Sequence, residues 1–259
     1  MTPTEQNLPR QASRVRRWGK SIVDMAIIVL VVVAAKSAIA EPYYVPSGSM
    51  EPTLKIGDEL LATKFPYGYS AASLPLFINL PDTQRVLGAL PHRGDIVVFR
   101  WPGDRSEIWV KRVIGLPGDR IAVRDGRVII NGVPVELKPD GTGEAESEDG
   151  TRQPVPQYIE TLPGNVSHEI FQESTNGPMD TMAELTVPPG HLFVMGDNRD
   201  NSADSRIPVS WGGVGLLPVS NLVGRVNVLV GSWDLATRNQ PLWTWPQGLR
   251  LSRFFSSVH

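Results

Sequence analysis

Two serines stand close together in the stretch VPSGSMEPTL, residues 45–54, and either hydroxyl becomes a nucleophile if a base lies beside it. The chain has no cysteine, so thiolate nucleophiles, disulfides and cysteine-based metal sites are excluded. Taken alone, the glycine and the two prolines of this stretch are more typical of a flexible linker. Ser47 and Ser49 therefore need a partner elsewhere in the chain before either acquires a chemical role.

The base for such a serine must be a nitrogen side chain, and histidine offers little support. The sequence contains neither a G-x-S-x-G elbow nor an H-E-x-x-H motif. A lone GLPGDR at 115–120 lacks the ending of a phosphate-binding loop and indicates a turn. None of the four histidines lies in a recognisable catalytic motif: they are His92, His168, His191 and His259.

Lysine is the alternative base, and Lys111 stands out among the six lysines. Period-two alternation in EIWVKRVIG, residues 107–115, places it on the same strand face as Trp109 and Val113. Burial among apolar side chains lowers the pKa of an ammonium from about 10.4 and makes the amine a base near pH 7 to 8. The other interpretation is an edge-strand lysine whose stem covers apolar surface while its head reaches water.

A third polar stretch, GDNRDNSADSR at 196–206, directly follows the apolar residues LFVM. So dense a polar run at the end of a strand is either an elaborate turn or one wall of an active site. Read alone, it is more typical of a turn.

The elements that would position these groups are mostly strands. They are short, rich in β-branched and aromatic residues, and bounded by Gly, Pro or Asp, which predicts an all-β body. The clearest are DIVVFRW (95–101), IWVKRVIG (108–115), HLFVMG (191–196) and NLVGRVNVLV (221–230).

Between the second and third of these strands, RIAVRDGRVIINGVPV at 120–135 predicts a meander. Asp125-Gly126 and Asn131-Gly132 are both two-residue hairpin turns that need positive φ. The next segment, 138–154, is acidic, poor in apolar residues and full of turn formers, so we expect a solvated loop there.

The first residues combine a basic cluster with the apolar block MAIIVLVVVAA at 25–35. A helix over 21–40 would reach about 30 Å, roughly one hydrocarbon core. A cleavable signal peptide is the alternative, because AIA at 38–40 fits the small-x-small pattern before a cut. Both interpretations keep the basic residues cytoplasmic and put the body on the far side. The basic residues are Arg10, Arg14, Arg16, Arg17 and Lys20.

Composition narrows the remaining classes. The 259 residues suffice for one large domain or two small ones, and a net charge of -2 with a pI near 6.1 argues against nucleic-acid binding. Near the other end, PLWTWPQGLRLSRFF at 241–255 combines aromatic residues with arginines. This segment suits either a membrane interface or packing against the sheet.

Four stretches together resemble the successive motif boxes of the type I signal peptidases, which are membrane-anchored Ser/Lys endopeptidases. They occur in the family's order, and the resemblance runs from about residue 22 to 230. FPYGYS (65–70) and NLVGRV (221–226) are similar to the Gram-negative members. The four stretches are PSGSMEPTL, RGDIVVFRWPGD, WVKRVIGLPGD and MGDNRDNSADSR.

The resemblance implies a role for each matching residue. Ser49 would be the nucleophile and Lys111 its general base. The Ser47 hydroxyl would join the Ser49 backbone N–H in an oxyanion hole, and Ser202 would orient the lysine. The remaining matches are supporting residues, namely the structural pair Asp204 and Arg206, and Met50 and Pro52 beside the nucleophile.

The implied fold is mainly β, with a single N-terminal transmembrane helix followed by an antiparallel β-sheet catalytic body that carries an inserted, smaller β-rich region. Expected segments are a basic cytoplasmic part (1–20), the anchor (21–40), the first catalytic part (41–115), the insertion with the acidic loop (116–187), the second catalytic part (188–235) and an aromatic and basic tail (236–259).

The implied function is removal of N-terminal signal peptides from exported preproteins, with cleavage after small residues in an A-x-A pattern. The expected location is the bacterial plasma (inner) membrane, single-pass, with the catalytic body on the periplasmic side. Preproteins and the phospholipid membrane are the expected partners, without nucleic acid, cofactor or metal. The resemblance favours a retained anchor over cleavage at 38–40, because a serine so close to the span must work at the membrane surface.

Two other functions remain open from the residues alone. One is an exported, non-catalytic β-domain that binds or scaffolds at the cell envelope, with PSGSM as a linker. The other is a self-cleaving Ser/Lys regulator of repressor type, although such a protein should carry a DNA-binding region in place of the apolar segment.

Overall fold

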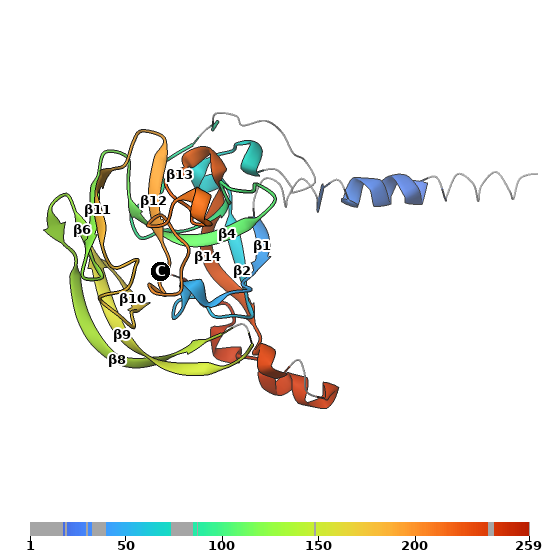
Figure 1. The fold of residues 1–259 in the computed structure, drawn as a ribbon. Coiled ribbons are helices and arrows are strands. Elements are labelled where there is room, and N and C mark those ends of the chain that lie inside the picture. Colours follow the sequence, from blue (N-terminus) through green and yellow to red (C-terminus); the bar gives the residue numbers. More distant parts are fainter. Residues whose placement is uncertain are drawn as a thin grey trace, which may run out of the picture.

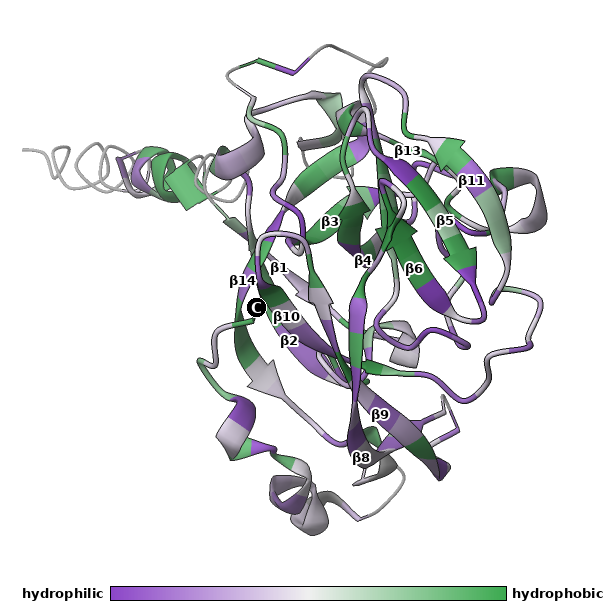
Figure 2. Cartoon of the chain, turned by 90° about the vertical axis from the view of Figure 1, so that its left-hand side faces the viewer, coloured by the Kyte–Doolittle hydropathy of each residue, from purple (hydrophilic) through white to green (hydrophobic). Residues whose placement is uncertain are grey.

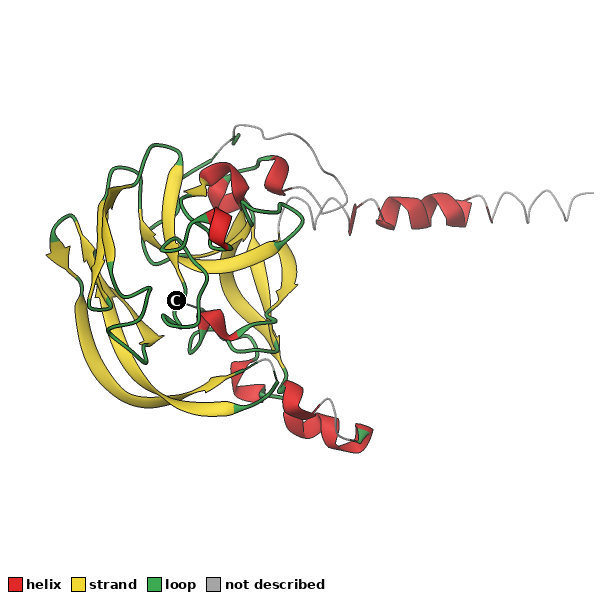
Figure 3. Ribbon diagram, viewed as in Figure 1, coloured by secondary structure: helices red, strands yellow, loops and turns green. Residues whose placement is uncertain are grey.

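The computed structural model describes residues 18, 20–29, 31–32, 40–73, 85–86, 88–147, 149–237 and 241–258. Strands make up most of the body, and short helical turns join them (Figures 1 and 3). The mainly β, antiparallel fold expected from the sequence is confirmed.

Within the described residues, the largest sheet has seven strands in the order β1-β2-β14-β3-β4-β12-β13. Every neighbouring pair is antiparallel. The last strand in the chain, β14, lies in the middle of the sheet between β2 and β3. The strands are β1 (Ala40–Tyr44), β2 (Asp58–Thr63), β3 (Ile96–Arg100), β4 (Ile108–Gly115), β12 (His191–Met195), β13 (Leu217–Pro218) and β14 (Leu222–Ser232).

Two smaller sheets follow β4 in the chain and precede β12. One has the order β11-β5-β6-β7 and the other β10-β9-β8. Asp125, Gly126, Asn131 and Gly132 all have positive φ, so both predicted hairpin turns of this region are present. The strands are β5 (Arg120–Arg124), β6 (Arg127–Ile130), β7 (Val133–Pro134), β8 (Glu136–Glu146), β9 (Arg152–Leu162), β10 (Val166–Phe171) and β11 (Met182–Thr186).

The prediction of a solvated loop at 138–154 is wrong. Most of that segment belongs to the long hairpin of β8 and β9, whose ladder runs from Glu136 opposite Thr161 to Glu146 opposite Arg152. Cross-strand hydrogen bonds satisfy the backbone, so charged and proline residues are tolerated on the exposed faces. In Figure 2 this hairpin is largely hydrophilic, whereas β3 and β4 are largely hydrophobic.

The large sheet is buried on both faces. Along β3, Ile96 and Val98 join one apolar cluster while Val97 and Phe99 join the other, as the period of two requires. A third cluster packs Ile114 of β4 against the four-stranded sheet. The middle strands are therefore rigidly held, which suits them to carry functional side chains.

Short 3-10 helices lie between the strands and in the segment that follows β14. They are η1 (Gly48–Met50), η2 (Phe65–Tyr67), η3 (Ala71–Ser73), η4 (Val209–Trp211), η5 (Val219–Asn221), η6 (Leu235–Thr237), η7 (Leu242–Gly248) and η8 (Leu251–Arg253). In the C-terminal tail, residues 241–258, some aromatic side chains pack against the body and others are exposed. Trp245 meets Trp233 edge to face at 5.7 Å, whereas the Trp243 side chain is 80% exposed.

The described residues between 18 and 32 are helical and point away from the sheets (blue in Figure 1). Their apolar side chains, from Ile22 to Val32, are exposed. No helix within the described ranges is both long and apolar enough to cross a membrane. The span predicted at 21–40 thus stays a prediction. Its residues 30 and 33–39, the motif at 38–39 and the basic residues before 18 lie outside the described residues, and Ala40 already belongs to β1.

Candidate active site

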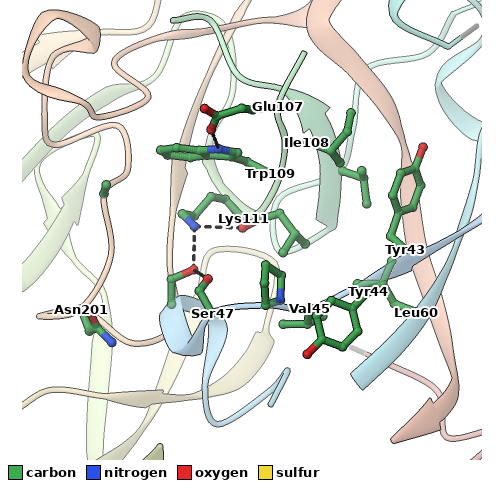
Figure 4. Close-up of a pocket in the computed structure, with 15 residues that line it drawn as sticks. Tyr43, Tyr44, Val45, Ser47, Leu60, Glu107, Ile108, Trp109, Lys111 and Asn201 are labelled. Atoms are coloured by element: carbon green, nitrogen blue, oxygen red, sulfur yellow. Dashed lines mark hydrogen bonds between the residues drawn. The ribbon is translucent and has the colours of Figure 1, made fainter. Parts of the chain in front are cut away.

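Ser49 and Lys111 meet in the structure although 62 positions separate them in the chain. Lys111 Nζ donates hydrogen bonds of 2.8 Å to Ser49 Oγ and 3.0 Å to the carbonyl of Val110 (Figure 4). Ser49 comes from η1, and Lys111 comes from β4 in the middle of the large sheet. A hydroxyl and an amine at this distance can exchange a proton directly.

The alternation of β4 points Lys111 into an apolar environment. Its side chain is 4% exposed, and the Trp109 ring lies 5.6 Å from Nζ. Trp109 in turn stacks on Trp101, with 5.0 Å between ring centroids. The predicted strand face is therefore confirmed, and the alternative of a lysine whose head reaches water is wrong because the side chain is buried and its Nζ binds Ser49 Oγ.

Burial lowers the pKa of Lys111 from 10.5 to about 8. The negative charges of Asp204 and Asp197 oppose this shift, and the positive charge of Arg206 adds to it. Loss of hydration dominates because an ammonium without water around it is costly. About one tenth of the amine is consequently neutral at pH 7 and about half at pH 8.

The polar stretch after β12 holds the turn that carries Ser49. Asn198 donates from its backbone N–H to the Ser49 carbonyl and from Nδ2 to the Gly48 carbonyl, both at 3.2 Å. A Cβ on Gly196 would lie 2.4 Å from the Ser49 carbonyl oxygen, so only glycine allows this approach. On the other side Met50 is fully buried in the core. The turn is thus fixed by hydrogen bonds on one side and by packing on the other.

The other predicted site residues differ in the contacts that they make. Ser47 Oγ lies 3.5 Å from Ser49 Oγ, facing the same cleft. Arg206 binds Asp204 with Nη2 2.8 Å from Oδ2 in a buried pair. Ser202 is buried beside Gly196, but its Oγ has no hydrogen-bond partner in the part of the chain that the structure describes. A hydrogen bond from Ser202 to Lys111 is therefore not formed here.

Sequence reasoning missed a buried ionic cluster behind the site. Arg112 follows Lys111 and so points to the opposite face, where its Nη2 lies 2.7 Å from Asp197 Oδ2. Arg199 binds Glu160 with Nη1 2.7 Å from Oε1, and His168 Nε2 lies 3.3 Å from Glu160 Oε2. The alternation that placed Lys111 also predicts the direction of Arg112. Nothing local marks Glu160 or His168, because they arrive from β9 and β10.

An apolar cleft of about 440 Å³ opens beside the dyad. Its lining includes the apolar residues Tyr43, Val45, Leu60, Ile108 and Val110, together with Ser47, Ser49 and Lys111. Figure 4 shows Ser47 and Lys111 close together in this cleft. At the rim, Trp109 Nε1 donates a 2.9 Å hydrogen bond to Glu107. The cleft suits an extended chain with small apolar side chains next to a scissile bond.

Known proteins resemble the chain over most of its length. The family described as signal peptidase, peptidase S26, matches residues 15–233. A signal peptidase I of Pseudomonas aeruginosa is 39% identical over 225 residues, which cover 83% of this chain and 72% of the relative. One from Rickettsia typhi is 33% identical over 259 residues, which cover 93% and 94%.

A crystal structure of a signal peptidase I from Enterococcus faecalis V583 is also similar. It shares 27% identity and covers 53% of this chain and 97% of that chain, with a TM-score of 0.31.

Proposed function

Because the chain belongs to the signal peptidase family, peptidase S26, we propose that Ser49 and Lys111 are the dyad with which it removes signal peptides. Membership makes the protein a serine endopeptidase acting on signal peptides, and it does not favour a non-catalytic envelope domain. The observation that carries the dyad is the 2.8 Å contact between Lys111 Nζ and Ser49 Oγ in an apolar cleft.

The chemistry needs no histidine. Neutral Lys111 accepts the proton of Ser49 as the oxygen attacks the scissile carbonyl carbon. When the tetrahedral intermediate collapses, the carbon–nitrogen bond breaks and the Lys111 ammonium gives its proton to the leaving amine. Water then attacks the acyl-enzyme ester while Lys111 takes its proton. When this second intermediate collapses, the ester carbon–oxygen bond breaks and the Lys111 ammonium returns the proton to Ser49 Oγ.

Ser47 fits the oxyanion hole. Its hydroxyl lies 3.5 Å from Ser49 Oγ and so can reach an oxyanion formed on the carbon that this oxygen attacks. The Ser49 backbone N–H would be the second donor. Two donors aimed at the developing charge stabilise the transition state more than the ground state.

Small residues before the cut are favoured by the shape of the cleft. Val45, Ile108 and Val110 are among the apolar residues that line it, and shallow apolar pockets between such residues would exclude large side chains. The A-x-A preference belongs to this proposal.

The pH dependence of cleavage tests the base. We expect kcat/KM to rise about tenfold per pH unit below a pKa near 8 and to level off above it, because only the neutral amine accepts a proton. The assay uses full-length protein in detergent with a preprotein substrate, and circular dichroism checks that the fold is unchanged over the range. A rate that levels off from pH 6.5 upward, as for a histidine base, would contradict the dyad.

A membrane anchor completes the proposal. The exposed apolar side chains at 22–29 and 31–32 would be covered by lipid, and β1 precedes the turn of Ser49 in the chain. The catalytic body would then lie at the extracytoplasmic face of the inner membrane, where preproteins emerge.

The anchor is tested by the mass of the purified protein. We expect intact chains in both the wild type and Ser49→Ala. A wild-type N-terminus at Glu41 in most molecules would contradict a retained anchor. If Ser49→Ala then kept the intact N-terminus, the cut would be identified as self-cleavage.

A further inference from the structure

The turn that carries Ser49 rests on strand β8 through a buried carboxylate. Glu51 is 1% exposed, and its Oε2 accepts a 3.0 Å hydrogen bond from the backbone N–H of Glu146. Gly48 lies against the same place, because a Cβ there would be 2.9 Å from the Glu146 carbonyl oxygen and 3.0 Å from Glu51 Oε2. The back of the turn is thus in close contact with the end of β8.

Glu146 is in turn held by the C-terminal tail. Arg250 Nη2 lies 3.1 Å from Glu146 Oε2, and Arg250 Nη1 donates a 2.7 Å hydrogen bond to the Ile56 carbonyl. Arg152 reaches the same Glu146 oxygen at 3.4 Å. One guanidinium therefore joins the end of β8 to the loop that follows the nucleophile.

A second arginine of the tail also binds this loop. Arg253 donates to the Thr53 carbonyl at 2.9 Å and to Asp58 Oδ1 at 3.1 Å. Both arginines lie beyond residue 233, where the family match ends. Two arginines of the tail thus hold the loop at 51–58.

We propose that Glu51 and Arg250 are positioning residues for Ser49. Glu51 fixes the nucleophile's turn to β8, and Arg250 fixes β8 and the following loop to each other. This role rests on the proposed function of Ser49. It is exerted from behind the turn, since neither side chain lines the cleft.

The burial of Glu51 supports a role beyond packing. Burial raises the pKa of Glu51 to about 7, while the Glu146 N–H opposes the shift and the Glu146 charge adds to it; Lys55 and Arg250 lower it. A carboxyl with a raised pKa destabilises the fold, because it ionises more easily in the unfolded chain. This cost begins above pH 4.5 and reaches its full size above about pH 7. An apolar residue would avoid this cost, so the carboxyl is better explained by the hydrogen bond that it accepts.

The experiment compares Glu51→Leu with Glu51→Gln in the full-length protein. Leucine fills the space but accepts no hydrogen bond, whereas glutamine keeps an acceptor oxygen without the charge. Active-site titration with a serine-acylating inhibitor counts competent molecules, so kcat is expressed per titrated site. We expect Glu51→Leu to lower this kcat about 10- to 100-fold with KM little changed, because sub-ångström displacement of a nucleophile is costly. Glu51→Gln should stay within about threefold of wild type.

Arg250→Met is the second variant, and Leu251→Ala is its matched control. Leu251 neighbours Arg250 on the tail but is 69% exposed, so its removal should leave kcat unchanged. For Arg250→Met we expect kcat per titrated site to fall by about 3- to 10-fold, since the Glu146 end of β8 loses one of its two arginines.

The outcomes separate positioning from stability. If Glu51→Leu gives fewer titratable sites but wild-type kcat per site, the residue is only structural and the proposal is overturned. A Glu51→Gln variant as slow as Glu51→Leu overturns the hydrogen bond as the cause, and an unchanged Arg250→Met removes Arg250 from the set. Failure of the dyad would show separately, as cleavage by the Ser49 or Lys111 variants.

Discussion

Replacement of Ser49 by alanine is expected to lower signal-peptide cleavage roughly ten-thousand-fold or more, to the background of the assay. The Ser49 hydroxyl forms the bond to the scissile carbon. Among the described residues, Lys111 Nζ has one other hydrogen-bond partner, the Val110 carbonyl, which cannot act as the nucleophile. Cleavage is measured by the appearance of mature protein under single-turnover conditions. The fold should be unchanged, because Ser49 makes its structural contacts through its backbone.

Ser47→Ala is the matched control for that variant. It removes a hydroxyl 3.5 Å away but leaves the nucleophile and base in place, so kcat should fall only about 100- to 1,000-fold with a similar KM. Equal residual rates in the two alanine variants would mean that the roles of the serines are not distinct. Full cleavage by Ser49→Ala would refute the mechanism.

Lys111→Met should lose cleavage to a similar extent. Methionine matches the length of the lysine stem and keeps an unbranched side chain in the same place, but it lacks the Nζ that lies over Trp109 and has no basic lone pair that accepts the proton of Ser49. The loss should persist across pH 6 to 10, whereas the wild type recovers activity as the pH rises through about 8. Wild-type cleavage by this variant at any pH would exclude Lys111 as the base.

The same variant should be more stable than the wild type at neutral pH. The folded pKa of Lys111, about 8, lies below its unperturbed 10.5. Below pH 8 the lysine is charged in both states, so its burial penalty is fully present, and the penalty fades as the pH rises from 8 to 10.5. We therefore expect a higher Tm for Lys111→Met at pH 7, with a difference that shrinks toward pH 10.5. A lower Tm at pH 7 would contradict this sign.

Local sequence patterns predicted the parts of the site that depend on one strand or one turn. Alternation along EIWVKRVIG was enough to orient Lys111, because side chains on a strand must point to opposite faces in turn. The hairpin dipeptides at 125–126 and 131–132 were predictable for the same reason, since positive φ is a property of the residues themselves. The pairing of Ser49 with Lys111 came only from the family resemblance.

The features that were missed depend on long-range pairing. The segment 138–154 has the composition of a loop, and its strand character comes from the ladder with β9. Nothing in SGSMEPTL marks Glu51 as buried, yet it is 1% exposed and its carboxylate accepts a hydrogen bond from the backbone of β8. Ser202 is buried beside Gly196, and its Oγ has no hydrogen-bond partner within the described residues. Contacts between distant segments leave no local trace in composition or period.

The central place of β14 has a consequence for the order of events during synthesis. Ser49 lies between β1 and β2 in the chain, whereas Lys111 lies on β4, which pairs with β3. In the large sheet, β14 is the strand that joins the β1–β2 pair to the β3–β4 pair. The sheet cannot close until residues 222–232 have left the ribosome, and such late, non-local pairing makes folding slow. A nascent chain therefore carries an unassembled protease for most of its translation, and the catalytic pair is completed among the last steps of folding.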